Sequence, residues 1–213
     1  MRKHWLAALI ALALAGVLAE IPARADQASA AQEAAATTGT HAAAGVSAGT
    51  TVSTVQIEIP QGLHLVRADG RPVLLDREID DGRPVIVNFV FTTCGSICPL
   101  MSQVFGQFQR GSGADHARVH LVSISTDPEE DSPARLRAYA KQFGAGPGWD
   151  HYTGTLEASL AAQRAFGVYR GDKMSHTPVT LLRAAPGRPW VRIDGFLTPG
   201  ELEAQFQQLT AAR

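Results

Sequence analysis

The sequence predicts an α/β fold, in which a central sheet is flanked by helices, and two observations lead to this class. First, residues 85–91 are almost continuously apolar and residues 119–125 mostly so, as expected of central strands covered on both faces. Second, helical signals follow each of these segments, and a strand hairpin and a last helix end the chain. About 160 residues carry these patterns, enough for one domain with a buried core.

Helices are predicted between and after the two central strands. Ser132 followed by Pro133 pairs a cap residue with the proline that suits the first helical position. Thr155 holds the same capping position before another helical stretch. The expected helices cover residues 100–109, 133–143 and 156–166.

Strand pairs are expected on both sides of this middle part. Near the end of the chain, 179–182 and 190–193 predict a hairpin around a turn that contains proline and glycine. Near the beginning, 55–59 alternates apolar with polar residues, as a half-buried strand does. The segments 63–66 and 73–75 that follow predict a further hairpin.

The last predicted helix begins after Thr198 and Pro199 and places Leu202, Phe206 and Leu209 on one face. The complete order is strand, helix, strand, helices, hairpin and helix. This is the thioredoxin-like order, with an extra N-terminal β-hairpin. The carboxyl end of the first central strand is where open α/β sheets place their sites.

The N-terminal part is expected to lie outside this domain. Residues 1–25 combine a basic start, an apolar run and a small-x-small site, the pattern of a secretory signal peptide. The run is shorter than the roughly 20 residues that span a bilayer, so we expect cleavage, with an uncleaved inner-membrane anchor as the alternative. Residues 26–51 are mostly small and polar and predict a disordered tether, which leaves the domain at 52–213.

The predicted export narrows the compartment of the protein, and the net charge narrows the kinds of partner. An exported chain meets an oxidising environment, and we expect the bacterial periplasm. The formal net charge of −1 gives no reason to expect a nucleic acid as partner. Contact with a membrane is expected only if the signal segment is retained.

Cys94 and Cys98 are the only cysteines of the chain, and they come just after the first central strand. Three residues separate them, one more than in thioredoxin-like reductases, and Gly95 in the loop lets both sulfurs face one point. Such a pair can close as a disulfide or offer two thiolates to a soft ion such as copper(I). A purely structural disulfide is the weaker interpretation, because so short a loop restrains little entropy of the unfolded chain.

A third ligand has to come from elsewhere in the chain, and His176 is the best candidate among the seven histidines. It lies immediately before the late hairpin, in the loop that thioredoxin-like folds set against the dithiol. An imidazole also suits copper(II). The weaker candidates are His4, His41, His64, His116, His120 and His151.

Several other side chains receive structural interpretations. His120 is expected on a surface or sheet face, and His151 in packing beside aromatic residues. Met101 and Met174 offer weak thioether ligands, although methionine is more often core filler. A solvated helix N-terminus stabilised by the helix dipole explains the acidic cluster, which consists of Asp127, Glu129, Glu130 and Asp131.

Four motifs occur together in the domain. They are the run 94–99 after residues 88–92, the Asp-Pro-x-x-Asp-Ser pattern within 123–132, the stretch 153–155, and the lone His176 before the late hairpin. Each alone is weak, but together they are specific. Through them, most of the domain resembles the Sco/SenC family of copper-binding proteins with a thioredoxin-like fold.

This resemblance implies a site and a function. Cys94, Cys98 and His176 would bind one copper ion per domain. The protein would help to assemble the dinuclear copper centre of a respiratory cytochrome c oxidase, or control the thiol redox state there. We therefore expect a metallochaperone rather than an enzyme, whose partner is the copper-receiving oxidase subunit or another periplasmic copper or thiol protein.

Two departures from the family pattern bear on the site. Ser175 stands where the family commonly has an acidic residue before the ligand histidine. A carboxylate that orients the imidazole must then come from elsewhere, and Asp172 is the conjecture. Pro178 resembles the cis-proline that faces the dithiol in disulfide oxidoreductases, and it favours thiol chemistry with a substrate.

The alternative function is a thiol-disulfide oxidoreductase or thiol peroxidase, with Cys94 as nucleophile and Cys98 as resolving thiol. This function needs no histidine. A peroxidase site would normally hold an arginine near the thiolate, and the sequence assigns none. Motifs of other enzyme classes are absent, including the Gly-x-Ser-x-Gly elbow, the phosphate-binding loop and the His-Glu-x-x-His zinc motif.

Overall fold

The computed structural model describes residues 49–111 and 118–211. The predicted signal peptide, most of the predicted tether, and three histidines (His4, His41 and His116) lie outside these residues. Within the described ranges, no helix has both the length and the apolar character needed to cross a membrane.

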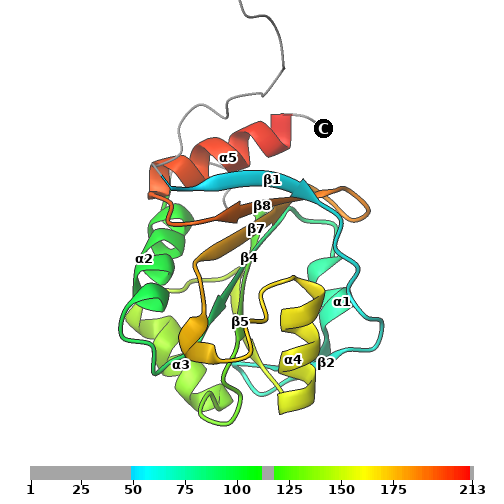
Figure 1. Cartoon of the computed structure of the whole chain (residues 1–213), viewed down its shortest axis with the longest axis vertical. Helices are drawn as coiled ribbons and strands as arrows, with labels where there is room; N and C mark the ends of the chain where they lie inside the picture. The colour runs from blue at the N-terminus through cyan, green and yellow to red at the C-terminus, as the bar shows by residue number, and fades with distance from the viewer. Residues whose placement is uncertain (1–48, 112–117, 212–213) are drawn as a thin grey trace, which may run out of the picture. The chain divides into compact units, whose positions relative to one another are not determined.

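The described residues form one eight-stranded sheet in the order β1-β8-β7-β4-β5-β6-β2-β3 (Figure 1). Strands β4, β5 and β6 are parallel in the middle, β7 runs antiparallel to β4, and β8 runs antiparallel to β7. The strands are β1 (Thr51–Val55), β2 (His64–Arg67), β3 (Pro72–Leu74), β4 (Val85–Val90), β5 (His120–Ser125), β6 (Trp149–Thr153), β7 (Val179–Arg183) and β8 (Trp190–Asp194).

Helices cover both faces of the sheet. Ser132 caps α3 by accepting the Arg135 N–H at 3.3 Å, and Thr155 caps α4 by accepting the Ala158 N–H at 3.1 Å. Both caps lie where the sequence predicts them. The helices are α1 (Leu75–Ile79), α2 (Ile97–Gln109), α3 (Pro133–Gln142), α4 (Leu156–Ala165), α5 (Pro199–Ala211) and a 3₁₀ turn, η2 (Lys173–Ser175).

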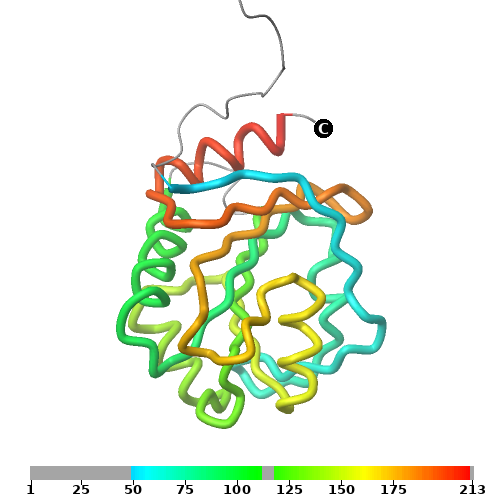
Figure 2. The backbone as a smooth tube through the Cα atoms, in the orientation of Figure 1, coloured from blue at the N-terminus to red at the C-terminus, as the bar shows by residue number. Residues whose placement is uncertain are grey.

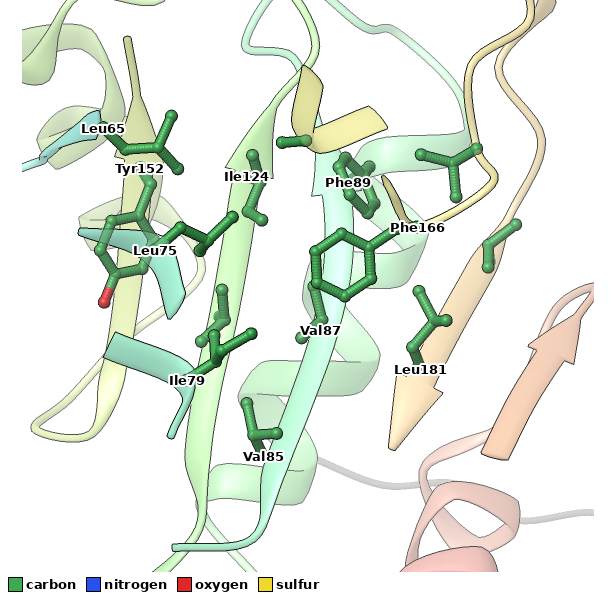
Figure 3. Close-up of a cluster of buried hydrophobic side chains, with 14 of the residues drawn as sticks. Leu65, Leu75, Ile79, Val85, Val87, Phe89, Ile124, Tyr152, Phe166 and Leu181 are labelled. Atoms are coloured by element: carbon green, nitrogen blue, oxygen red, sulfur yellow. The ribbon is translucent and has the colours of Figure 1, made fainter. Parts of the chain in front are cut away.

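Strand β4 is buried along its whole length and separates two parts of the core. Val85, Val87 and Phe89 belong to the cluster under α1 and α4, where Phe89 meets Phe166 edge to face (Figure 3). Ile86 belongs to the cluster on the other face, under α2 and α5. Because alternate residues of a strand point to opposite faces, the apolar run serves both clusters, as predicted.

The α/β architecture is confirmed, and so is the early hairpin, formed by β2 and β3. The chain trace shows that β1 and α5, the first and last elements, lie side by side (Figure 2). One strand is displaced from its prediction: β1 covers Thr51–Val55 rather than 55–59. Its partner β8 begins at Trp190, opposite Val55, so the residues after Val55 have no β8 residue to pair with.

Candidate metal centre

The cysteine loop connects β4 to α2 and brings the Cys94 sulfur to the N-terminus of that helix. The Cys94 N–H donates to the Phe91 carbonyl at 3.1 Å, which closes a turn just after the strand. The Cys94 sulfur accepts the Cys98 N–H at 3.4 Å. Cys94 is partly exposed, whereas Cys98 is buried among Val90, Phe91 and Tyr139.

The two thiols therefore differ in acidity. Partial burial raises the pKa of Cys94, but the Cys98 N–H and thiol and the N–H groups of Ser96 and Ile97 outweigh it, so this pKa lies below its usual range. Burial and the neighbouring Cys94 thiol raise the pKa of Cys98 far above its usual range. Cys94 is thus the more acidic thiol of the pair, and Cys98 stays protonated at neutral pH.

Both cysteines are free thiols in this structure, which describes the reduced protein. The disulfide between Cys94 and Cys98 stays a prediction for the oxidised protein.

His176 reaches the same end of β4 from the turn η2. The pairing of β4 with β7 ends at Asn88 opposite Thr180. The next carbonyl of β4, that of Phe89, accepts a hydrogen bond from Nε2 of His176 at 3.1 Å. Phe89 lies five residues before Cys94 in the sequence, so the histidine loop and the cysteine loop meet at one strand end.

This hydrogen bond fixes which nitrogen of His176 is free. Burial lowers the pKa of His176 and the charge of Arg170 lowers it further, while the bond to Phe89 opposes both, and the net shift leaves the ring neutral at pH 7. Because a carbonyl can only accept, Nε2 carries the proton and Nδ1 carries the lone pair. Nδ1 is therefore the nitrogen able to bind a metal ion.

Two expectations about the surroundings of His176 are wrong. The Asp172 carboxylate does not orient the ring; it caps η2 by accepting the Met174 N–H at 2.9 Å. The Phe89 carbonyl takes the orienting role instead. The peptide bond before Pro178 is trans, so the analogy with a cis-proline fails.

The acidic cluster is only partly a solvated helix start. Glu129 and Glu130 are exposed, but Asp127 and Asp131 are 4% and 0% exposed. Their carboxylates bind other loops, because Asp127 pairs with Lys173 of η2 and Asp131 accepts two hydrogen bonds from Thr92 of the cysteine loop. The prediction of a solvated turn is thus wrong for these two aspartates.

These two aspartates are the residues near the site that sequence reasoning missed. The Asp-Pro-x-x-Asp-Ser pattern gives their positions, but a hydrophilic stretch carries no sign of burial. The one available signal is their place directly after β5, at the same sheet edge as the cysteines.

The remaining sequence candidates take different positions, and Met174 is exposed on η2. His64 is exposed on β2, and Met101 is buried in α2. His151 packs against Trp149 and Tyr139, as predicted. His120 is 2% exposed and hydrogen-bonded to Glu78 and Asp150, so of the two expected positions it takes the sheet face under α1 and not the surface.

The structure brings two of the predicted ligands together and places the third at the same strand end. Cys94 and Cys98 are in contact, and His176 is fixed on β4. Across residues 49–111 and 118–211, no three histidine, cysteine or carboxylate side chains are gathered closely enough to hold a metal ion. The three-ligand set stays a prediction, and it requires the His176 loop to close on the thiols.

The sequence comparisons point to one family. A family model described as SCO1/SenC matches residues 56–211. The SCO1 protein homolog of Bacillus subtilis is 32% identical over 93 residues, which are 43% of this chain and 47% of that protein. The chain thus spans about half the length of this curated relative.

Solved structures share the fold. The copper-bound ScoI of Arabidopsis thaliana is similar with a TM-score of 0.56 and 26% identity, covering 70% of this chain and 96% of that one. BsSco, described as a member of the Sco family of cytochrome c oxidase assembly proteins with a disulfide switch, has a TM-score of 0.62 and 22% identity, covering 76% and 98%. These likenesses confirm the predicted thioredoxin-like class.

Proposed function

The chain belongs to the SCO1/SenC family, and from this premise we propose that it is a copper-binding metallochaperone. Its task is to bind one copper ion through Cys94, Cys98 and His176 and to pass that ion to a cytochrome c oxidase during assembly. The copper-bound ScoI of Arabidopsis thaliana and the oxidase assembly role named for the family of BsSco support this proposal.

One observation carries the proposal: two thiols in contact, one of them with a lowered pKa, and a neutral imidazole lie at the same end of β4. Thiolate sulfur and imidazole nitrogen are ligands that copper prefers in both of its oxidation states. The hydrogen bond to Phe89 presets the tautomer that leaves Nδ1 of His176 free. The donor set therefore fits copper.

The two thiols bind the copper ion one after the other, Cys94 before Cys98. Cys94 is the first ligand, since its pKa is below the usual range and its side chain is partly exposed. Cys98 must lose its proton on binding, which makes copper uptake release a proton and strengthen with pH. His176 completes the site when its loop closes, and its withdrawal opens a coordination position for the recipient's ligand.

Copper titration of the reduced protein tests this function. We expect one ion per chain, and about 10- to 100-fold weaker copper(II) binding in His176→Ala, since a lost ligand costs at least as much as a lost partner of a ligand. His64→Ala is the matched control, because His64 is exposed on β2. Equal affinity in His176→Ala and the parent would remove His176 from the site.

A second function has an observation of its own in its favour. The acidity difference suits a thiol-disulfide oxidoreductase, in which the Cys94 thiolate attacks a substrate disulfide and Cys98 then attacks the mixed disulfide. The substrate leaves with two thiols, and Cys94 and Cys98 end as a disulfide. Reduction of a small disulfide by the copper-free protein measures this activity, and negligible turnover rejects it.

The compartment and the partner are part of the same proposal. We propose export to the periplasm with removal of residues 1–25, on the sequence pattern of the N-terminus. The mature protein should then begin at Asp26 and be recovered in the periplasmic fraction. Recovery with the inner membrane, starting at Met1, would favour the anchored alternative. The partner is the copper-receiving oxidase subunit or another periplasmic copper or thiol protein.

A further inference from the structure

Lys173 is the only residue of η2 with an ion pair among those described. Its Nζ lies 2.5 Å from Oδ2 of Asp127, at the end of β5. The Asp127 side chain is 5% exposed and that of Lys173 is 38% exposed. A carboxylate with so little contact with water depends on this ammonium for its neutralisation.

Asp127 is itself held firmly in place. Its N–H donates to Oγ of Ser125 at 3.0 Å, and its carbonyl accepts the Asp131 N–H at 2.8 Å. The Ser125 hydroxyl donates to Asp131 at 2.6 Å, and Asp131 accepts the N–H and hydroxyl of Thr92. One short segment after β5 therefore binds the histidine loop through Asp127 and the cysteine loop through Asp131.

Lys173 is closely connected to His176. The His176 N–H donates to the Lys173 carbonyl at 3.1 Å, so the two residues are the two ends of one 3₁₀ turn. The structure thus fixes this turn at two points, the Lys173 ammonium on Asp127 and the His176 ring on Phe89.

We propose that Lys173 is a positioning residue for His176. Its ion pair with Asp127 holds the histidine loop at the same end of the sheet as the cysteine loop, from where Nδ1 of His176 joins the two sulfurs when the loop closes. The inference rests on the proposed copper function, and it goes beyond the ligand set by naming the contact that sets the position of the third ligand.

The test is a double-mutant cycle on copper(II) affinity in the reduced protein. Lys173→Gln keeps the aliphatic stem and removes the charge, and we expect about 10-fold weaker binding, as for other groups that orient a ligand. In a His176→Ala background the same change should have no effect, because there is no imidazole left to position. Lys173→Arg should restore the parent affinity.

Arg135→Gln is the matched control. Arg135 pairs with Glu130 at 2.7 Å in the same segment, but both side chains are about half exposed and neither belongs to the site loops. We expect parent affinity for this variant. Equal weakening by Arg135→Gln and Lys173→Gln would indicate a general charge effect and overturn the inference.

A measurement without copper separates this inference from the proposed function. In the metal-free protein, the side-chain ¹⁵N signals of His176 report the Nε2–H bond to Phe89. We expect Lys173→Gln to shift them, while Arg135→Gln leaves them unchanged. Unshifted signals, or equal loss of affinity with and without His176, would refute the positioning role. An unaltered affinity in His176→Ala would instead refute the ligand role.

Discussion

Asp131 offers a direct test of how the cysteine loop is held. Its carboxylate is 0% exposed and accepts the Thr92 N–H at 3.0 Å, the Thr92 hydroxyl at 2.5 Å and the Ser125 hydroxyl at 2.6 Å. Replacing Asp131 with alanine removes the acceptor of all three donors. Replacing it with asparagine keeps the shape and one acceptor oxygen but removes the charge.

The contacts set the expected magnitude. A hydrogen bond to a charged group contributes about 1.5–3 kcal/mol, and a buried donor left without a partner costs about 1–3 kcal/mol. The two hydroxyls can turn to other acceptors, whereas the Thr92 amide cannot. We therefore expect the free energy of unfolding to fall by about 3–5 kcal/mol in Asp131→Ala and by about 1–2 kcal/mol in Asp131→Asn.

Urea unfolding of the reduced, metal-free protein measures both changes. Glu129→Ala is the control, because Glu129 is an exposed acidic residue of the same segment, and it should stay within about 0.5 kcal/mol of the parent. If Asp131→Ala is no more destabilising than Glu129→Ala, the carboxylate does not hold the cysteine loop and the reasoning fails.

Three further predictions concern other residues. Burial lowers the pKa of His151 to about 4, below its unfolded value near 6.5. As pH falls, the unfolded chain therefore takes up the proton first, and the free energy of unfolding should fall by roughly 3 kcal/mol between pH 6.5 and pH 4. In His151→Phe, the free energy of unfolding should depend less steeply on pH over this range. An unchanged slope would contradict the prediction. Gly106→Ala should destabilise the protein by about 1–3 kcal/mol and lower its melting temperature, although alanine favours helices. The reason is that the added Cβ would lie 2.6 Å from the Phe143 carbonyl oxygen. A higher melting temperature would show that this contact relaxes. Iodoacetamide should alkylate Cys94 well before the buried Cys98, as peptide mass mapping over time can show, and equal rates would argue against the acidity difference.

The predicted helices and strands that the structure confirms had strong local signals in the sequence. The caps Ser132 and Thr155 mark the starts of α3 and α4, and the apolar run of β4 predicts its central place. β6 and α1 were not predicted. β6 contains Asp150 and His151 between aromatic residues, which hides the strand pattern, and α1 has only five residues, too few for a helical period to show.

The site likewise has parts that the sequence predicts and parts that it does not. The spacing of Cys94 and Cys98 predicts a shared position, and the place of His176 before β7 predicts its approach to the same edge. The partners that hold these loops could not be predicted. Burial of Asp127 and its pairing with Lys173 depend on two loops 46 residues apart in sequence, and no local pattern encodes such a contact.

X-ray absorption at the copper edge tests the central claim most directly. The reduced protein loaded with one copper ion should show two sulfur neighbours and one nitrogen neighbour, and His176→Ala should lose the nitrogen while keeping both sulfurs. An all-sulfur environment in the parent, or a nitrogen that persists in His176→Ala, would contradict the site formed by Cys94, Cys98 and His176.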